Sequence, residues 1–187
     1  MVEAGVESTR RRLTVLEDAP CKTGCSGCCR RMVHITLAEA IVMQKHLEDG
    51  KVWPSVLGRC LGALQASREA SPTSWFRMNV ECPVLSKDEC LAYEVRPAAC
   101  AVHFALSKPE LCHPWSTESG EYSPVELEDV FAKFRATVES IVDAHGILAV
   151  KLHLPMALIM AERIRHQPGL TPESLLRIVI NELRTAP

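Results

Sequence analysis

The segment Cys21-Lys22-Thr23-Gly24-Cys25-Ser26-Gly27-Cys28-Cys29 places four thiols within nine residues. Two glycines separate the cysteines, and glycine adopts positive φ without steric cost, so this segment is predicted to curl around a point. Thiolates on a curled loop suit a soft metal, such as zinc, Cu(I) or an iron–sulfur cluster. The segment therefore predicts half of a metal site, and the other half is expected further along the chain.

Four more cysteines lie downstream, in a stretch with little helical periodicity and several prolines: Cys82, Cys90, Cys100 and Cys112. Neighbouring side chains, such as those of Cys28 and Cys29, point about 100° apart in a helix and to opposite faces in a strand, so they do not easily ligate one ion together. The eight thiols are therefore expected to form two sets of four, as in two zinc sites, or to hold one [4Fe–4S] cluster with reserve ligands.

The composition favours one folded domain, because the chain has 187 residues and 47% of them are hydrophobic. The formal net charge of −2 gives no electrostatic reason to expect nucleic acid or an anionic membrane as a partner. No apolar segment reaches the roughly 20 residues of a membrane span, and no apolar signal-peptide core follows Arg10–Arg12. A cytoplasmic location is expected, where clustered cysteines bind metal or do chemistry more often than they form disulfides.

The expected fold is mainly α, with a cysteine-rich, loop-dominated metal-binding front packed on a helical scaffold. Its expected parts are a flexible lead-in over 1–19, a cysteine-cluster region over 20–115 and a helical region over 116–187, the last two packed as one domain. Thr36 and Glu39 match a capping box and predict a helix from Leu37 to Glu48, with Leu37, Ile41 and either Gln44 or Lys45 near one face.

Apolar periodicity and terminator residues predict four further helices, over 54–68, 123–146, 155–165 and 171–184. Residues 71–74 are predicted to form a loop and 82–112 to form loops and turns, while 147–154 fit either strand or helix. Val56, Leu57, Cys60, Leu61 and Leu64 share one apolar face of the helix over 54–68. The ninth cysteine, Cys60, is therefore interpreted as a small buried hydrophobic residue.

The cysteine motifs together resemble the YkgJ-type cysteine-cluster family, which is described as a zinc- or iron-chelating domain. The resemblance covers about half of the chain. It rests on the CxxxCxxCC run of 21–29, on Cys82-Pro83-Val84-Leu85, on the C-x-x-Y-E-x-R-P-x-x-C pattern of 90–100, and on Cys112. Val84, Ala92 and Ala101 stand where the family has Phe, Ile and Arg, and the last change removes a cation beside a thiolate.

The resemblance implies metal chelation through the eight cysteines, as a [4Fe–4S] cluster or as zinc. The family is similar to the cysteine-rich region of flagellin lysine N-methylases, so one alternative is an iron–sulfur-dependent, protein-lysine methyltransferase-like enzyme. Another is a zinc-stapled module that binds a protein partner, and whether the chain is an enzyme stays open. Cys21, Cys25 and Cys28 also match the spacing of radical-SAM enzymes, but the chain lacks the alternating strands and helices of that fold.

Several other side chains are expected near the metal. Tyr93, Glu94 and Arg96 are predicted to hydrogen-bond around it, with Arg96 either offsetting thiolate charge or pairing with Glu94. His103 and His113 flank the second group of cysteines and are alternative ligands, since histidine is a common zinc ligand.

Overall fold

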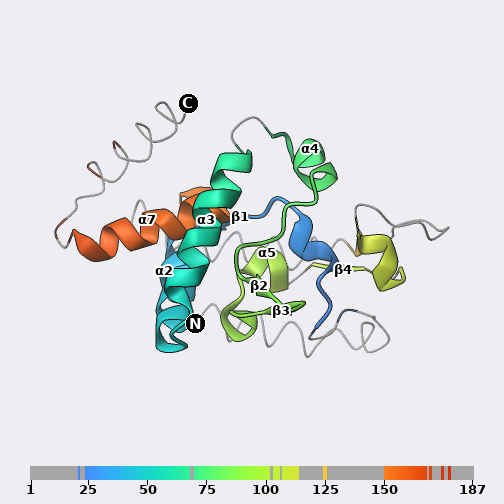
Figure 1. Cartoon of the computed structure of the whole chain (residues 1–187), viewed down its shortest axis with the longest axis horizontal. Coiled ribbons are helices and arrows are strands. Elements are labelled where there is room, and N and C mark those ends of the chain that lie inside the picture. Colours follow the sequence, from blue (N-terminus) through green and yellow to red (C-terminus); the bar gives the residue numbers. More distant parts are fainter. Residues whose placement is uncertain are drawn as a thin grey trace.

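The computed structural model describes residues 21, 24–67, 70–101, 103–105, 107–113, 124–125 and 150–167, together with residues 169, 174 and 177. The described part is mainly α-helical, as predicted, and its strands form short two-stranded sheets (Figure 1). None of the helices in this part combines the length and apolarity needed to cross a bilayer.

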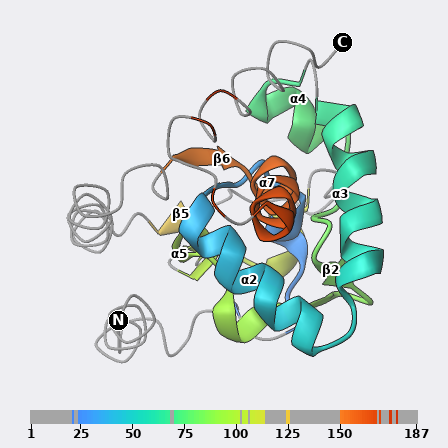
Figure 2. The ribbon, with the colours of Figure 1, turned by 90° about the vertical axis from the view of Figure 1, so that its left-hand side faces the viewer.

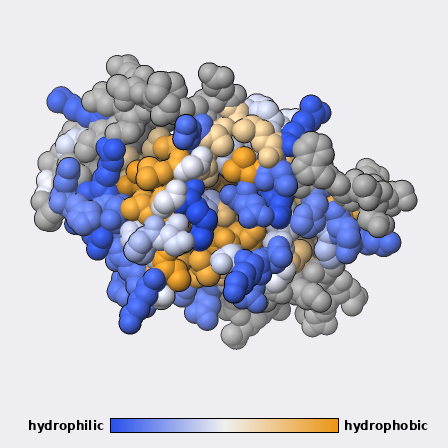
Figure 3. Space-filling model, viewed as in Figure 1, coloured by the Kyte–Doolittle hydropathy of each residue, from blue (hydrophilic) through white to orange (hydrophobic). Residues whose placement is uncertain are grey.

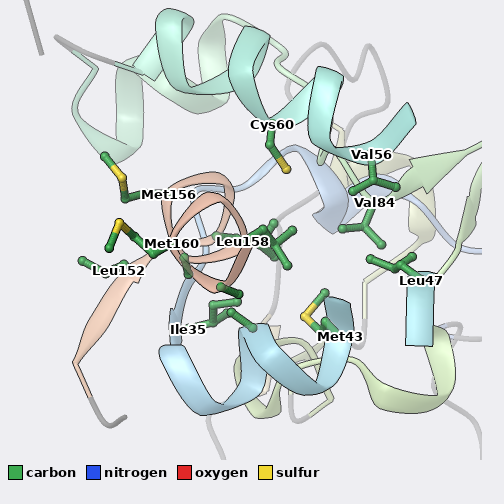
Figure 4. Close-up of a cluster of buried hydrophobic side chains, with 14 of the residues drawn as sticks. Ile35, Met43, Leu47, Val56, Cys60, Val84, Leu152, Met156, Leu158 and Met160 are labelled. Atoms are coloured by element: carbon green, nitrogen blue, oxygen red, sulfur yellow. The ribbon is translucent and has the colours of Figure 1, made fainter. Parts of the chain in front are cut away.

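The largest helices are α2 (Leu37–Asp49), α3 (Trp53–Ser67) and α7 (Leu154–His166), which match the predicted helices over 37–48, 54–68 and 155–165. Viewed end-on, α7 lies between α2 and α3 (Figure 2). The three helices enclose most of the apolar core, together with the strand that precedes α2 (Figure 4). Ile35, Met43, Val56, Leu158 and Met160 are almost completely buried there.

The predicted capping box opens α2. The Thr36 hydroxyl accepts a hydrogen bond from the backbone N–H of Glu39 at 3.2 Å, and the Glu39 carboxylate accepts one from the Thr36 N–H at 2.7 Å. The same carboxylate also accepts a hydrogen bond at 2.9 Å from the N–H of Ala98, the first residue of α5 (Ala98–Ala101). Glu39 therefore joins the core helix to the short helix that carries Cys100.

The buried faces of two helices differ in part from the predicted ones. In α2, Ile41 is only half-buried. Of the two alternatives for the same face, Gln44 is buried, where its amide donates a hydrogen bond to Glu162 of α7, and Lys45 is exposed. In α3, Cys60 is fully buried, as predicted, but Leu61 is 56% exposed. The side chain of Leu61 points about 100° around the helix from that of Cys60, which turns it away from the core.

A short antiparallel ladder connects distant parts of the chain. Strand β1 (His34–Thr36) pairs with β6 (Lys151–His153), with Ile35 opposite Leu152 and His34 opposite His153. The Leu154 N–H then donates to the Val33 carbonyl at 2.8 Å where α7 begins. Three residues of the ambiguous stretch 147–154 are thus a strand.

Helix α4 (Pro72–Arg77) replaces the loop predicted over 71–74. The Ser71 hydroxyl caps it by accepting a hydrogen bond from the Ser74 N–H at 3.1 Å, and Pro72 occupies the first turn. The loop prediction was wrong because six residues are too few to show helical periodicity. Trp75 of this helix is buried and meets the ring of His153 edge-on, with 4.7 Å between ring centroids.

His153 is expected to make folding sensitive to acid. Burial, with a smaller contribution from His34, lowers the pKa of His153 from 6.5 to about 4. Between these values the unfolded chain binds a proton that the folded chain does not, so the free energy of unfolding falls as the pH drops from 6.5 to 4, by up to about 3 kcal/mol. Urea unfolding across this range should show the decrease, and His153→Gln should reduce it. If the free energy of unfolding of the variant fell equally steeply with pH, His153 would not be the cause of the acid sensitivity.

Other predictions fall largely outside the described residues. Strand β4 (Phe104–Ala105) pairs antiparallel with β5 (Pro124–Val125), so Pro124 does not begin a helix, as the prediction over 123–146 required. A two-residue pairing with a remote strand leaves no local sequence signal. The rest of that helix, most of the helix over 171–184, the lead-in over 1–19 and the boundary at 115–116 lie outside the residues that the structure describes.

Candidate metal centre

Cys28 and Cys29 lie on η2 (Gly27–Arg30), a short 3₁₀ helix that contacts the later cysteine segments. The Cys29 carbonyl accepts a hydrogen bond from the Cys82 N–H at 2.7 Å. The Arg30 guanidinium pairs with Glu81 at 2.7 Å. These contacts hold the first cysteine group against the start of the second.

A tight hairpin positions Cys90. Strands β2 (Leu85–Ser86) and β3 (Glu89–Cys90) are joined by Lys87 and Asp88, whose φ values of 51° and 61° are those of a turn that favours Asn-Gly. Asp88 accepts a hydrogen bond from the Ser26 hydroxyl at 2.8 Å, so the turn is also attached to the first cysteine loop. The sequence did not reveal this hairpin because Lys-Asp is not a typical turn pair.

Cys112 reaches the first loop through a close approach at Gly27. A Cβ built on Gly27 would lie 2.6 Å from the Cβ of Cys112, which belongs to the 3₁₀ helix η4 (Pro109–Cys112). No side chain fits between them, so glycine is required here for the backbone to approach. Cys21 lies beside β4, where its Sγ accepts a hydrogen bond from the Ala105 N–H at 3.3 Å.

Replacing Gly27 with alanine is expected to push η4 away from η2 and to lower the free energy of unfolding by about 1–3 kcal/mol. The thiol of Cys112, which is 4% exposed, should then react faster with a thiol reagent in the folded protein. Gly62→Ala is the matched control, since a Cβ at this position in α3 meets nothing within 4 Å. That change should stabilise the helix by up to about 1 kcal/mol. Equal effects of the two substitutions would contradict the close approach.

The thiols of the second segment lie close to one another and to η2. Burial raises the pKa of Cys82 to about 12, and the thiols of Cys90 and Cys28 add to this increase. Burial also raises the pKa of Cys100 well above its usual value, with contributions from Cys82, Cys28 and Cys90. Cys82, Cys90 and Cys100 thus lie near enough to Cys28 for the charge of its thiolate to affect them.

The adjacent thiols of η2 form a hydrogen-bonded pair. The bond from Cys29 lowers the pKa of Cys28, and nearby Arg31 and Arg96 lower it further. The same bond raises the pKa of Cys29. The pair therefore favours one thiolate, on Cys28, with the proton kept on Cys29.

Two arginines are held beside the thiols by aromatic rings. The Arg96 guanidinium lies over the ring of Tyr93, 4.1 Å from its centroid, and Arg31 lies over Phe76 at 5.1 Å. In the described part of the chain no ion pair joins Arg96 to Glu94, which was the alternative role for Arg96. Of the two arginines that follow Cys29 directly, Arg31 acts to lower the pKa of Cys28 and Cys112, and Arg30 pairs with Glu81.

The donor chemistry suits a soft metal, but the side chains do not surround one point. All nine cysteines are free thiols, and each lies in the described part of the chain. Among the described residues, however, no group of three or more His, Cys, Asp or Glu side chains is placed to hold a metal ion. Ligation of one metal ion by several of these thiols would therefore require them to rearrange.

The histidines add no further ligand set in the described residues. Burial and the charge of Arg31 lower the pKa of His103, so this imidazole is neutral near pH 7. His113 directly follows η4 and is half-buried.

Comparison of the chain with family models, with curated proteins and with solved structures found no match. The resemblance to the YkgJ-type family therefore stays a prediction from the cysteine motifs.

Proposed function

We propose that this protein binds a soft metal centre, either zinc or a [4Fe–4S] cluster, through its eight clustered cysteines. The observation that carries the proposal is the meeting of two distant cysteine segments at η2. Gly27 contacts Cys112, and Cys29 is hydrogen-bonded to Cys82. On this proposal the cysteine-rich segments form the metal-binding front, and α2, α3 and α7 form the scaffold.

The arginines beside the thiols support thiolate rather than neutral sulfur. Placing a guanidinium in a partly buried position is costly unless an anion lies nearby. Arg31 and Arg96 both adjoin Cys28, and Arg96 also adjoins Cys90 and Cys100. Metal-bound thiolates would supply a nearby negative charge for the guanidinium of Arg96, which uncharged thiols would not.

Anaerobic purification of the full chain, followed by metal analysis and an absorption spectrum, tests the proposal. Iron with sulfide and broad absorption near roughly 400 nm would indicate a cluster, and stoichiometric zinc without colour would indicate zinc sites. Cys100→Ser should reduce the metal content, while Cys60→Ala should not. A chain that takes up no metal and keeps all thiols reactive would refute the proposal.

A zinc-stapled interaction module is the second candidate, because α3 exposes Leu61 on its outer face. Figure 3 shows apolar and polar residues side by side in the region of α3, and Leu61 is 56% exposed. A Cβ built on Gly58 or Gly62 of the same helix would meet nothing within 4 Å. Zinc without iron, together with a partner whose binding is weakened by Leu61→Asp, would favour this role. Binding of S-adenosylmethionine by an iron-loaded chain would instead favour the methyltransferase-like enzyme.

A further inference from the structure

We propose that acid detaches α4 from the β1–β6 ladder, and that protonation of His153 drives this detachment. Phe76 of α4 leaves Arg31 in the same step, so acid also changes the surroundings of an arginine that directly follows η2. The detachment needs no bound metal, and it is therefore independent of the proposed function.

The buried side chain of Trp75 attaches α4 to the ladder. Among the α4 side chains that the structure describes, only this one is buried, and its ring meets that of His153 edge-on at 4.7 Å. The indole N–H is buried without a hydrogen-bond partner in the described part, which disfavours the attached state. No described residue of α4 belongs to the apolar core around α7, and α4 lies at the edge of the ribbon in both views (Figures 1 and 2). α4 can therefore detach while the core stays packed.

The position of His153 disfavours a charged imidazole as long as α4 is attached. His34 lies directly opposite on β1, with 6.0 Å between the ring centroids. The Leu154 N–H donates to the Val33 carbonyl beside this pair, so the two histidines form a non-hydrogen-bonded pair, whose side chains approach most closely. His153 is also the N-cap of α7, where the positive end of the helix dipole opposes a cation. In keeping with this placement, burial and, to a smaller extent, His34 lower the pKa of His153 to about 4.

The other charged residues of the surrounding elements offer no compensation to a protonated His153. Lys151 lies two residues earlier on β6, and Arg77 is the only charged residue of α4. Both are cations. From its first residue, α7 carries no acidic side chain before Glu162. His34 of β1 is thus the titratable group that faces His153 across the ladder.

Detachment of α4 is the least disruptive way to bring water to the imidazole. Opening the ladder instead would expose Ile35 and Leu152, which are 1% and 7% exposed and belong to the core. Once α4 has left, the pKa of His153 returns towards 6.5, so the detached state binds the proton more tightly than the attached one. The population therefore shifts towards the detached state as the pH falls from 6.5 to 4.

The segment that follows α4 limits how far the detachment spreads. The Arg30 guanidinium pairs with Glu81 at 2.7 Å, and the Cys82 N–H donates to the Cys29 carbonyl at 2.7 Å. Neither contact involves a residue of α4. We expect the chain to stay attached from Glu81 onward, whereas the 5.1 Å contact of Phe76 with an arginine is lost.

Hydrogen exchange of the reduced full chain at pH 7 and pH 5 tests the proposal, because a detached six-residue helix does not persist in water. The reporters are the N–H groups of Trp75 and Met78, which donate to the carbonyls of Ser71 and Ser74. After correction for intrinsic exchange, their protection should fall about twentyfold between the two pH values, from a pKa of 6.5 detached and about 4 attached. Protection of the Cys82 N–H and of α2 and α7 should not fall with it.

Three variants make the result specific. His153→Gln should make the protection of α4 independent of pH, and His34→Gln should reduce the fall in part. His166→Gln is the matched control, because this exposed histidine lies at the opposite end of α7, and it should retain the full fall. A pH-independent α4 in the unmodified chain, or an equal fall throughout α2 and α7, would overturn the proposal. So would α4 amides that exchange at the intrinsic rate already at pH 7, since α4 would then not be attached.

Discussion

On the proposed function, removal of the bound metal is expected to lower the free energy of unfolding by about 4 kcal/mol, when the free metal had been present at about a thousand times its dissociation constant. Only folding brings the thiols of the two segments together, so the metal binds the folded chain more tightly than the unfolded one and this difference adds to the folding energy. The loss should be concentrated in the cysteine-rich segments, since these are held by short turns and few long elements.

Thermal unfolding before and after chelation, together with hydrogen exchange, measures this effect. Exchange should accelerate over residues 24–34 and 81–113, while α2 and α7 retain most of their protection. Cys60→Ala is the control, because this thiol lies in α3 outside the proposed ligand set and the variant should show the same response to chelator. An unchanged melting curve after complete metal removal would contradict the expected coupling.

Leu158→Ala is expected to lower the free energy of unfolding by about 3 kcal/mol. Leu158 is fully buried on α7, at the centre of the core between α2 and α3 (Figure 4). Truncation removes apolar contacts and leaves a cavity that three packed helices cannot easily close. Urea unfolding with an unchanged m-value would measure the effect directly.

Leu61→Ala provides a control with the same chemical change. Leu61 also lies within a helix, α3, but its side chain is 56% exposed. Leucine and alanine both favour helices, so this change should cost no more than about 0.5 kcal/mol. A cost at Leu61 as large as that at Leu158 would show that the exposed face of α3 is covered in solution.

The helices that frame the core were predictable because their signals are local. A capping box lies at Thr36 and Glu39, and Pro54 and Pro155 each mark a first helical turn. The exposure of Leu61 was not predictable, because it depends on which side of α3 receives α7. The strand over 151–153 could not be predicted either, because it forms only by pairing with residues 34–36.

The candidate site, like the fold, was predictable from the sequence only in part. The motif of 21–29 and the later cysteines identify the thiols as a set, because clustered thiols on glycine- and proline-rich segments have few other uses. The approach of Gly27 to Cys112 and the bond from Cys82 to Cys29 could not be foreseen. Each contact joins two segments that lie far apart in the sequence, and neither segment carries a local signal of the other.

By itself, the amino-acid sequence determined a mainly α chain with long core helices and a set of clustered cysteines, since helix caps, periodicity and residue type act over a few neighbouring residues. Only the tertiary structure decided which cysteines are neighbours, which arginines lie beside them and which helix faces are buried. These features depend on the packing of remote segments around η2 and α7, and such packing is a property of the whole chain.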